Sequence, residues 1–192
     1  VNFDLRSGEV LALLGENGAG KSTLMKILSG VYQRDAGTVR VFDQDVEVAL
    51  SPRRAQELGV AIIHQELNMC RHLTVAENIF LGREICDNLG RLNTKEMNRQ
   101  SAQVLSSMNV DIDPTTIVGT LSISKQQMVE IAKALSTQAK VLIMDEPTSS
   151  LTGREIEDLF IIIKKLKAQG HGIVYISHRL EELHHIVDRV TI

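Results

Sequence analysis

The chain has 192 residues, of which 43% are hydrophobic and 23% are charged, and its formal net charge is −3. This composition is typical of a globular protein with one substantial core, and the weak negative charge gives no electrostatic reason to expect nucleic acid as a partner. Cys70 and Cys86 are too few for a disulfide framework and lack zinc-site spacing, which favours a reducing cytosolic compartment. Because the sequence has no apolar run of roughly 18 residues and no signal peptide, we expect no transmembrane helix.

The amino-terminal residues alternate between apolar and polar side chains, which predicts a strand at residues 1–6. A second strand is predicted at residues 9–14, after the turn at Ser7-Gly8, so antiparallel strands are expected at this end of the chain. The sequence starts without Met and stops within an apolar run. We therefore expect it to be a fragment of a longer protein.

The stretch GENGAGKST, after the apolar residues 10–14, has the pattern of a phosphate-binding loop. A helical pattern follows at Thr23–Ser29, with Gly30 as its C-cap. Glycines allow positive φ and close backbone approach, so successive N–H groups can point at phosphate oxygens, and the helix adds its positive end. A chance match of a glycine turn is the alternative, but the flanking strand and helix favour phosphate binding. The residues expected to bind phosphate are Gly15, Glu16, Asn17, Gly18, Ala19, Gly20, Lys21, Ser22 and Thr23.

Within this loop, Lys21 is expected to reach the β- and γ-phosphates of a nucleotide, and the hydroxyl of Ser22 to ligate Mg²⁺.

Strands and helices alternate before and after the middle of the chain, which implies parallel strand pairing through right-handed crossovers. The middle has helical spacing instead and is predicted to be an inserted helical subdomain. The predicted division is an α/β nucleotide-binding core at 1–66 and 137–192, with the helical subdomain at 67–136. Further strands are predicted at 38–42, 46–48, 60–63, 141–144, 172–176 and 189–192. Further helices are predicted at 52–58, 75–81, 94–108, 124–135, 154–168 and 180–187.

Two adjacent carboxylates follow the apolar residues 141–144. Ligands bind at the carboxyl edge of a parallel sheet, so Asp145 and Glu146 are expected to face a bound nucleotide. Asp145 continues the buried strand and is the better candidate to hold Mg²⁺. Glu146 is the better candidate for a general base that activates water for attack on the γ-phosphate. The alternative is an acidic turn at a strand end with no chemical role.

A serine-containing stretch, LSISKQQ at 121–127, opens the helix predicted at 124–135. Ser124 and Gln127 have the spacing of a capping box. Either this is only a well-capped helix, or its free N–H groups and the hydroxyls of Ser122 and Ser124 face a second anion. The residues alone do not decide between these interpretations.

Two further polar residues follow predicted strands and are expected at the same sheet edge. His178 follows the strand at 172–176, and it is either a structural hydrogen-bond donor or a group that meets the γ-phosphate. Gln65 follows the strand at 60–63, and it is either a polar loop residue or an amide that orients water or Mg²⁺.

Taken together, these stretches resemble the ATP-binding cassette (ABC) ATPases over nearly the whole chain. Six motifs stand in the family's order: the Walker A loop at 15–23, the Q-loop Gln65, the signature at 121–127, the Walker B strand at 141–145 with the catalytic Glu146, the D-loop at 149–152 and the switch His178. In the signature, Ile123, Ser124 and Lys125 replace Gly, Gly and Gln of the family's LSGGQ.

The wording of several segments is similar to the ATPase subunits of bacterial monosaccharide importers of the ribose, galactose and xylose type. These segments are GENGAGKSTLMKILSG, HQEL, LTVAENIFLGRE, QQMVEIAKALS, MDEPTSSLT and GIVYISHRLEEL. In that group one polypeptide commonly carries two cassettes, and this chain resembles the first.

The resemblance implies a P-loop NTPase fold with a helical insertion, ATP and Mg²⁺ as ligands, and ATP hydrolysis coupled to sugar import. It implies a second cassette in head-to-tail contact, permease subunits in the membrane and, indirectly, a periplasmic sugar-binding protein, at the cytoplasmic side of the inner membrane. One rival is a soluble ABC ATPase that acts on ribosomes or nucleic acid, and another is a module that binds ATP without hydrolysing it. The residues to which the resemblance assigns roles are Lys21, Gln65, Glu146 and His178 in catalysis, Ser22, Gln65 and Asp145 at Mg²⁺, and Ser122 and Ser124 at the nucleotide.

Overall fold

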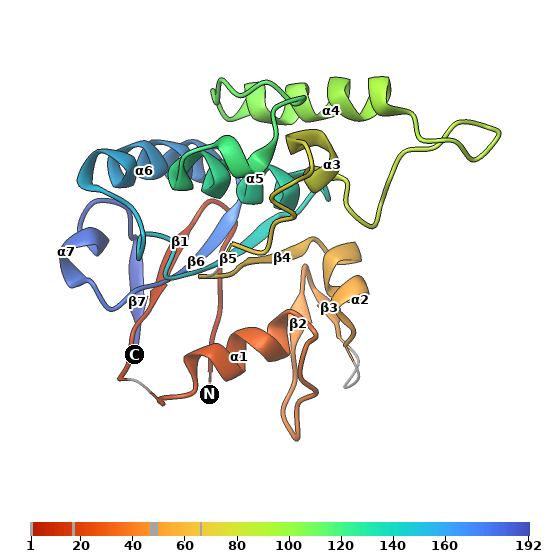
Figure 1. Cartoon of the computed structure of the whole chain (residues 1–192). Helices are drawn as coiled ribbons and strands as arrows, with labels where there is room; N and C mark the ends of the chain where they lie inside the picture. The colour runs from red at the N-terminus through yellow and green to blue at the C-terminus, as the bar shows by residue number, and fades with distance from the viewer. Residues whose placement is uncertain (1, 17, 47–49, 66) are drawn as a thin grey trace.

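A central parallel β-sheet with helices on both faces forms the body of the molecule in the computed structural model, which describes residues 2–16, 18–46, 50–65 and 67–192 (Figure 1). The strands are β1 (Val10–Leu13), β2 (Arg40–Val41), β3 (Gln44–Asp45), β4 (Val60–Ile63), β5 (Val141–Asp145), β6 (Gly172–Ile176) and β7 (Arg189–Thr191). The helices are α1 (Lys21–Leu28), α2 (Pro52–Glu57), α3 (Val75–Ile79), α4 (Thr94–Ser107), α5 (Ile123–Leu135), α6 (Gly153–Ala168) and α7 (Leu180–Leu183), with a 3₁₀ turn η1 (Val118–Thr120).

The central sheet has the strand order β4-β5-β6-β1-β7, and every neighbouring pair is parallel. This arrangement confirms the expected α/β architecture with parallel pairing. Strands β1 and β6 are buried along their whole length, as expected for a sheet covered on both faces. The register aligns the carboxyl ends of the strands, because Leu13 pairs with Ile176 and Ile176 pairs with Asp145.

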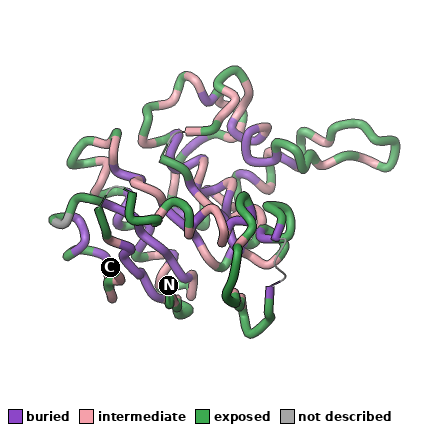
Figure 2. Tube along the Cα trace, turned by 90° about the horizontal axis from the view of Figure 1, so that it is seen from below, coloured by how far each residue is buried: buried purple, intermediate pink, exposed green. Residues whose placement is uncertain are grey.

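Two hydrophobic cores lie on opposite faces of this sheet, and the alternation of side chains along each strand assigns residues to them. In β5, Leu142 and Met144 pack into the larger core with α3, α4, α5 and α6, whereas Ile143 packs into the smaller core. The smaller core also contains Met25 of α1 and Ala55 of α2. Figure 2 shows the buried part of the chain concentrated in the central strands. The phosphate-loop helix and α5 are therefore held on different faces of the sheet.

Helices α3, α4 and α5 follow β4 and precede β5, and they cover one face of the sheet (Figure 1). Helix α3 begins with a capping box in which Thr74 and Glu77 bond each other's backbone N–H groups. Helix α4 begins at the N-cap Asn93, whose side chain accepts a hydrogen bond from Glu96 N. The helical content of this region agrees with the sequence pattern, and its boundaries at 67–136 stay a prediction.

The strand expected at the amino terminus is wrong for residues 2–6, and Val1 lies outside the described residues. The backbone here bonds to side chains rather than to a neighbouring strand. The carbonyl of Asp4 accepts from Arg189 at 2.8 Å, and the N–H of Arg6 donates to Glu9 at 2.8 Å. Among the described residues, antiparallel pairing occurs between β2 and β3, outside the main sheet.

Several other expected elements differ from the structure in extent. Strand β2 covers only Arg40–Val41 of the expected 38–42, and its partner is Gln44–Asp45. Of the strand expected at 46–48, Val46 donates its N–H to Val39 O at 2.8 Å without being part of a strand, and the other two residues lie outside the described residues. Helix α7 ends at Leu183, four residues before the expected end, and a turn follows it.

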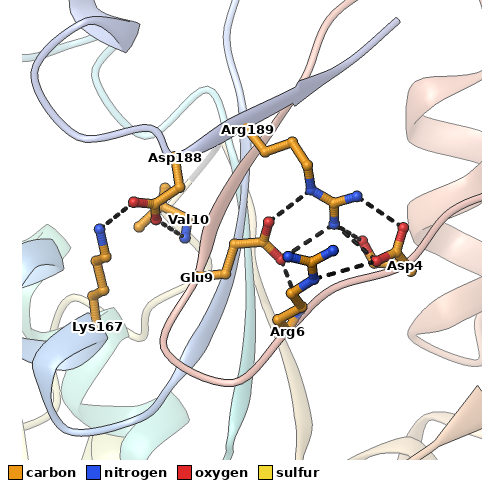
Figure 3. A network of polar contacts seen from close by, with 7 residues as sticks. All are labelled: Asp4, Arg6, Glu9, Val10, Lys167, Asp188 and Arg189. Carbon is orange, nitrogen blue, oxygen red and sulfur yellow. Dashed lines mark hydrogen bonds and ion pairs between the residues drawn. The ribbon is translucent and has the colours of Figure 1, made fainter.

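The amino ends of β1 and β7 are joined by a network of ion pairs and hydrogen bonds (Figure 3). Arg189 donates to Glu9 at 2.7 Å and 3.2 Å, and to the Asp4 carboxylate at 2.9 Å and 3.0 Å. Asp188 accepts from Val10 N at 2.8 Å and pairs with Lys167 of α6. The hydrogen bonds from Arg189 lower the pKa of Glu9 and of Asp4. This network fixes where β1 begins.

As far as the chain is described, its helices lack the combined length and apolar character that crossing a bilayer requires.

Candidate functional site

The glycine loop connects the carboxyl end of β1 to the first turn of α1, as the sequence pattern predicts. Gly18 and Gly20 have φ values of +87° and +91°, a region that favours glycine, and a Cβ built on either would meet no atom within 4 Å. The space beside the backbone of Gly18 and Gly20, where a side chain would otherwise lie, is therefore empty. Gly15, Glu16, Gly18, Ala19 and Gly20 are exposed, and Asn17 lies outside the described residues. This open backbone fits a loop that wraps around an anion.

The side chain of Lys21 folds back over this loop. Its ammonium donates to Gly15 O at 2.7 Å and to Glu16 O at 2.9 Å. Both acceptors are neutral carbonyls, so the positive charge over the loop has no carboxylate in these two contacts. The hydroxyl-bearing Ser22 and Thr23 are exposed in the first turn of α1. A cation and the N-terminus of a helix therefore meet at the end of β1, and both favour a bound phosphate.

Asp145 is the last residue of β5 and lies half-buried two strands away from β1, a separation of about 10 Å. Burial raises the pKa of Asp145, and the neighbouring charge of Glu146 raises it further. Three basic side chains lie close enough to oppose this shift, namely those of His64, Lys21 and Lys26. The carboxylate predicted for Mg²⁺ is thus electrostatically coupled to the lysine of the phosphate loop.

Glu146 and His178 are brought together although they are 32 residues apart in the sequence. The Nδ1 atom of His178 lies 2.9 Å from Oε1 of Glu146, within hydrogen-bond distance. Glu146 has a φ of +46°, uncommon for a residue with a side chain, and its N–H donates to Ile176 O at 2.9 Å. Backbone strain of this kind is typical of functional sites. In this strained turn the Glu146 carboxylate faces His178, two residues after the end of β6.

Gln65 follows β4 by two residues and is exposed. Because Ile63 of β4 pairs with Met144 of β5, Gln65 extends from the same carboxyl edge as Asp145. The sheet register therefore brings the predicted residues of β1, β4, β5 and β6 to one edge, and the glycine loop lies at that edge too.

The serines of the signature stretch lie elsewhere. They belong to the start of α5, which packs on the face of the sheet opposite α1. The expected capping box of Ser124 and Gln127 is wrong, because the N-cap is Ser122, whose hydroxyl accepts from Lys125 N at 3.4 Å. The Ser124 hydroxyl instead lies 3.0 Å from that of Ser122, and the pKa of Glu155 in α6 is lowered by the Thr152 N–H and also by the Ser124 hydroxyl. Ser122 is exposed and Ser124 is half-buried, so Ser122 is the more accessible of the two to another molecule.

The match to known proteins decides the family. The model of the ABC transporter family matches residues 1–149, which is most of the chain. The chain belongs to the ABC transporter family. His178 lies beyond the residues that this family model matches.

Members of the ABC transporter family that match this chain include sugar import proteins. A putative ribose/galactose/methyl galactoside import ATP-binding protein 2 of Burkholderia cenocepacia is 59% identical over 191 residues, covering 99% of this chain and 37% of that protein. The ribose import ATP-binding protein RbsA of Geobacillus kaustophilus is 53% identical over 195 residues, covering all of this chain and 39% of that protein. This chain spans less than two fifths of the length of these relatives.

Solved ABC structures share the fold. A nucleotide-free ATP-binding cassette from an ABC transporter superposes with a TM-score of 0.83 at 26% identity, over 97% of this chain and 77% of that chain. The ADP conformation of MJ1267, an ATP-binding cassette of an ABC transporter, has a TM-score of 0.81 at 26% identity, over all of this chain and 79% of that chain. The fold is therefore that of an ABC cassette, in agreement with the P-loop NTPase fold expected from the sequence.

Sequence reasoning missed a buried polar cluster beside the Glu146–His178 pair. Glu182 of α7 accepts from the hydroxyls of Thr148 at 2.7 Å and Tyr175 at 3.1 Å. All three residues are at most 8% exposed. The available signal was weak, since Tyr175 and Glu182 lie in different predicted elements and Thr148 lies between two others, and only the fold brings them together.

The residues at the sheet edge fit a nucleotide with Mg²⁺. Across residues 2–16, 18–46, 50–65 and 67–192, no group of three or more His, Cys, Asp or Glu side chains is arranged to hold a metal ion. Mg²⁺ is usually bound by one or two carboxylates together with phosphate oxygens and water, so it does not need such a group. The open loop at Gly18 and Gly20 would supply the phosphate cradle, and the half-buried Asp145 would supply the carboxylate.

Proposed function

We propose that this chain is an ATP-binding and ATP-hydrolysing cassette that drives the import of a monosaccharide. One observation carries the proposal: the Glu146–His178 pair and Asp145 share a sheet edge with the phosphate loop and its Lys21. The import function is supported by relatives whose names describe ribose or galactose import and which are 53% to 59% identical to this chain.

In this proposal, the amides of residues 15–23 and the ammonium of Lys21 hold the phosphates of ATP. Lys21 exchanges its two carbonyl acceptors for phosphate oxygens when the nucleotide binds. The Ser22 hydroxyl and the Asp145 carboxylate would hold Mg²⁺, which supplies charge neutralisation between the phosphates when bound. These contacts position the γ-phosphate over the carboxyl edge of the sheet.

Glu146 is proposed as the general base, because a carboxylate at this edge can accept a proton from the attacking water. His178 holds the Glu146 carboxylate through the 2.9 Å contact and turns toward the γ-phosphate when ATP is present. Gln65, exposed at the end of β4, orients the water or the Mg²⁺ shell. Phosphoryl transfer of this kind requires mainly positioning and charge stabilisation, which these side chains provide.

A second cassette is proposed to complete the site. The exposed Ser122 and the half-buried Ser124 lie on the α5 side of the sheet, away from the phosphate loop of the same chain. A head-to-tail partner, within the same polypeptide, would bring its serines to this loop and take those of this chain in return. The other proposed partners are membrane permease subunits and, indirectly, a periplasmic sugar-binding protein. The proposed location is the cytoplasmic side of the inner membrane.

We also propose the domain division in which 1–66 and 137–192 form the nucleotide-binding core and 67–136 forms the helical subdomain.

The test is to reconstitute the full-length protein with its permease in lipid vesicles. ATP turnover is then measured with a series of binding proteins, each loaded with one sugar. We expect one monosaccharide-loaded binding protein to stimulate turnover above that of the empty binding protein. If turnover ignores every loaded binding protein and the protein purifies with ribosomes or nucleic acid, the import function is wrong.

A further inference from the structure

A buried carboxylate lies directly behind the Glu146–His178 pair. Glu182 receives three donors, which are the hydroxyl of Thr148 at 2.7 Å, the hydroxyl of Tyr175 at 3.1 Å and the guanidinium of Arg179 at 3.3 Å. Its side chain is 9% exposed. A buried carboxylate with three donors is well satisfied, and hydrogen bonds to a charged acceptor are stronger than neutral ones. The cluster is therefore a rigid point in this part of the molecule.

The donors come from the segments that carry the pair. Thr148 lies two residues after Glu146, in a turn where Ser149 N donates to Glu146 O at 3.2 Å. Arg179 directly follows His178, and its N–H donates to the Ser177 hydroxyl at 3.0 Å. One carboxylate thus bonds the turn that contains the base and the loop that contains the histidine.

The cluster does not contain the reacting groups. Tyr175 is fully buried in β6, and burial raises the pKa of its hydroxyl above the ordinary value of 10.0, so this hydroxyl stays protonated and donates. Thr148 is 1% exposed. Neither hydroxyl is open to the side of the sheet edge where a nucleotide would bind. Any effect of these residues on chemistry must therefore pass through Glu146 and His178.

We infer that Glu182, with Thr148 and Tyr175, forms a positioning cluster that holds Glu146 and His178 within hydrogen-bond distance of each other. This inference rests on the proposed ATPase function. Glu146 needs an external support because its φ of +46° is strained and the turn can relax if nothing holds it. The bond from Thr148 to Glu182 supplies that support on one side, and the contact of Arg179 supplies it on the other.

The test uses the full-length protein with the substitutions Thr148→Val and Tyr175→Phe, which remove one hydroxyl each. Thr148→Ser keeps the hydroxyl, and Thr137→Val is the matched control, because the Thr137 hydroxyl bonds Ala134 O at 2.6 Å at the far end of α5. We expect Thr148→Val to lower kcat about 10-fold, while the Kd for ATP changes less than about two-fold. Thr148→Ser should restore most of kcat, Tyr175→Phe should lower it less than Thr148→Val, and Thr137→Val should behave as wild type.

A double substitution checks the shared bond. If Thr148 acts through Glu182, then Thr148→Val combined with Glu182→Gln lowers kcat by less than the product of the two single effects. The inference is overturned if the effects multiply, if Thr148→Val keeps its kcat, or if its loss lies entirely in KM or in ATP affinity.

Hydrogen exchange of the nucleotide-free protein supplies a readout that does not need turnover. We expect faster exchange in residues 146–151 and 177–180 of Thr148→Val, and unchanged exchange in Thr137→Val. If wild-type protein hydrolyses no ATP, the proposed function fails, and the exchange comparison still decides whether the cluster holds the two segments. Equal exchange in Thr148→Val and wild type would overturn the positioning role.

Discussion

The two ends of β1 carry polar groups that are bonded in opposite ways. At its amino end, Glu9 and Arg189 satisfy each other through short ion-pair hydrogen bonds, and Asp188 caps the strand (Figure 3). At its carboxyl end, the Lys21 ammonium rests on two neutral carbonyls, and most of the described loop residues are exposed.

The amino end of β1 therefore anchors the strand, whereas its carboxyl end is open to bind a ligand. A network in which each charge has an opposite charge gains little from a further ligand, whereas a cation resting on carbonyls can exchange them for phosphate oxygens. The carboxyl edge of the neighbouring part of the sheet also differs from the amino ends of the strands. Glu146 has a strained backbone there and contacts His178. Substitutions at the two ends of the strands should therefore change different properties.

His178→Ala is expected to give a large loss of turnover at the carboxyl edge. Removing the imidazole frees the Glu146 carboxylate and takes away the group proposed to face the γ-phosphate, so turnover should fall about 100-fold. ATP turnover of the full-length protein measures this loss. His184→Ala is the matched control, since His184 is exposed beyond α7 and should keep wild-type turnover. Equal turnover in the two variants would remove His178 from the mechanism.

Lys21→Ala should weaken ATP binding about 10- to 100-fold, because a hydrogen-bonded positive charge on the phosphates is lost. Titration calorimetry on the full-length protein measures the affinity. Lys95→Ala removes an exposed lysine in the first turn of α4 and should leave affinity unchanged. Wild-type affinity in Lys21→Ala would contradict the assignment of the loop.

Glu9→Gln probes the amino end and is expected to change stability rather than activity. The substitution weakens the bonds from Arg189 and should lower the free energy of opening of β1 and β7 by about 1 to 2 kcal/mol near pH 7. Native-state hydrogen exchange of the full-length protein measures this quantity. The surface variant Glu57→Gln, in which two solvent-exposed pairs with Arg53 and Arg54 are weakened, should change it by less than about 0.5 kcal/mol.

The effect of Glu9→Gln should also depend on pH. Because Arg189 lowers the pKa of Glu9 below its ordinary value of 4.5, the stabilisation is complete above pH 4.5 and is lost as the pH falls through the lowered value. The difference between wild type and Glu9→Gln should then shrink below pH 4.5. A difference that stays constant into strong acid would show that the carboxylate charge is not its source.

Local patterns predicted the parts of this site that lie within one element. The glycine spacing identified the loop before α1, and the apolar run ending in Asp145 identified β5, because alternation and glycine content are properties of neighbouring residues. Parallel pairing then brought these ends together as expected. The helices of the insertion were also found from their spacing, with small errors at their ends.

Contacts between distant segments could not be predicted in the same way. Arg189 and Glu9 are 180 residues apart. Where a strand was expected at residues 2–6, Arg189 donates to Asp4 O and Glu9 accepts from Arg6 N. Likewise, the sequence offered Ser124 as a cap, whereas the fold uses Ser122 and directs Ser124 toward Glu155 of α6. The positive φ of Glu146 could not be predicted from the sequence either, because glycine is the residue that indicates a positive φ, and this position carries a glutamate.

The most direct test of the carboxyl edge as a catalytic site compares ATP binding and phosphate release in Glu146→Gln. The substitution keeps the size of the side chain and removes its basicity. We predict wild-type ATP affinity together with a loss of turnover of about 100- to 10,000-fold in the full-length protein. Undiminished phosphate release from this variant would contradict Glu146 as the base, and a loss of affinity that accounts for the whole effect would contradict the separation of binding from chemistry.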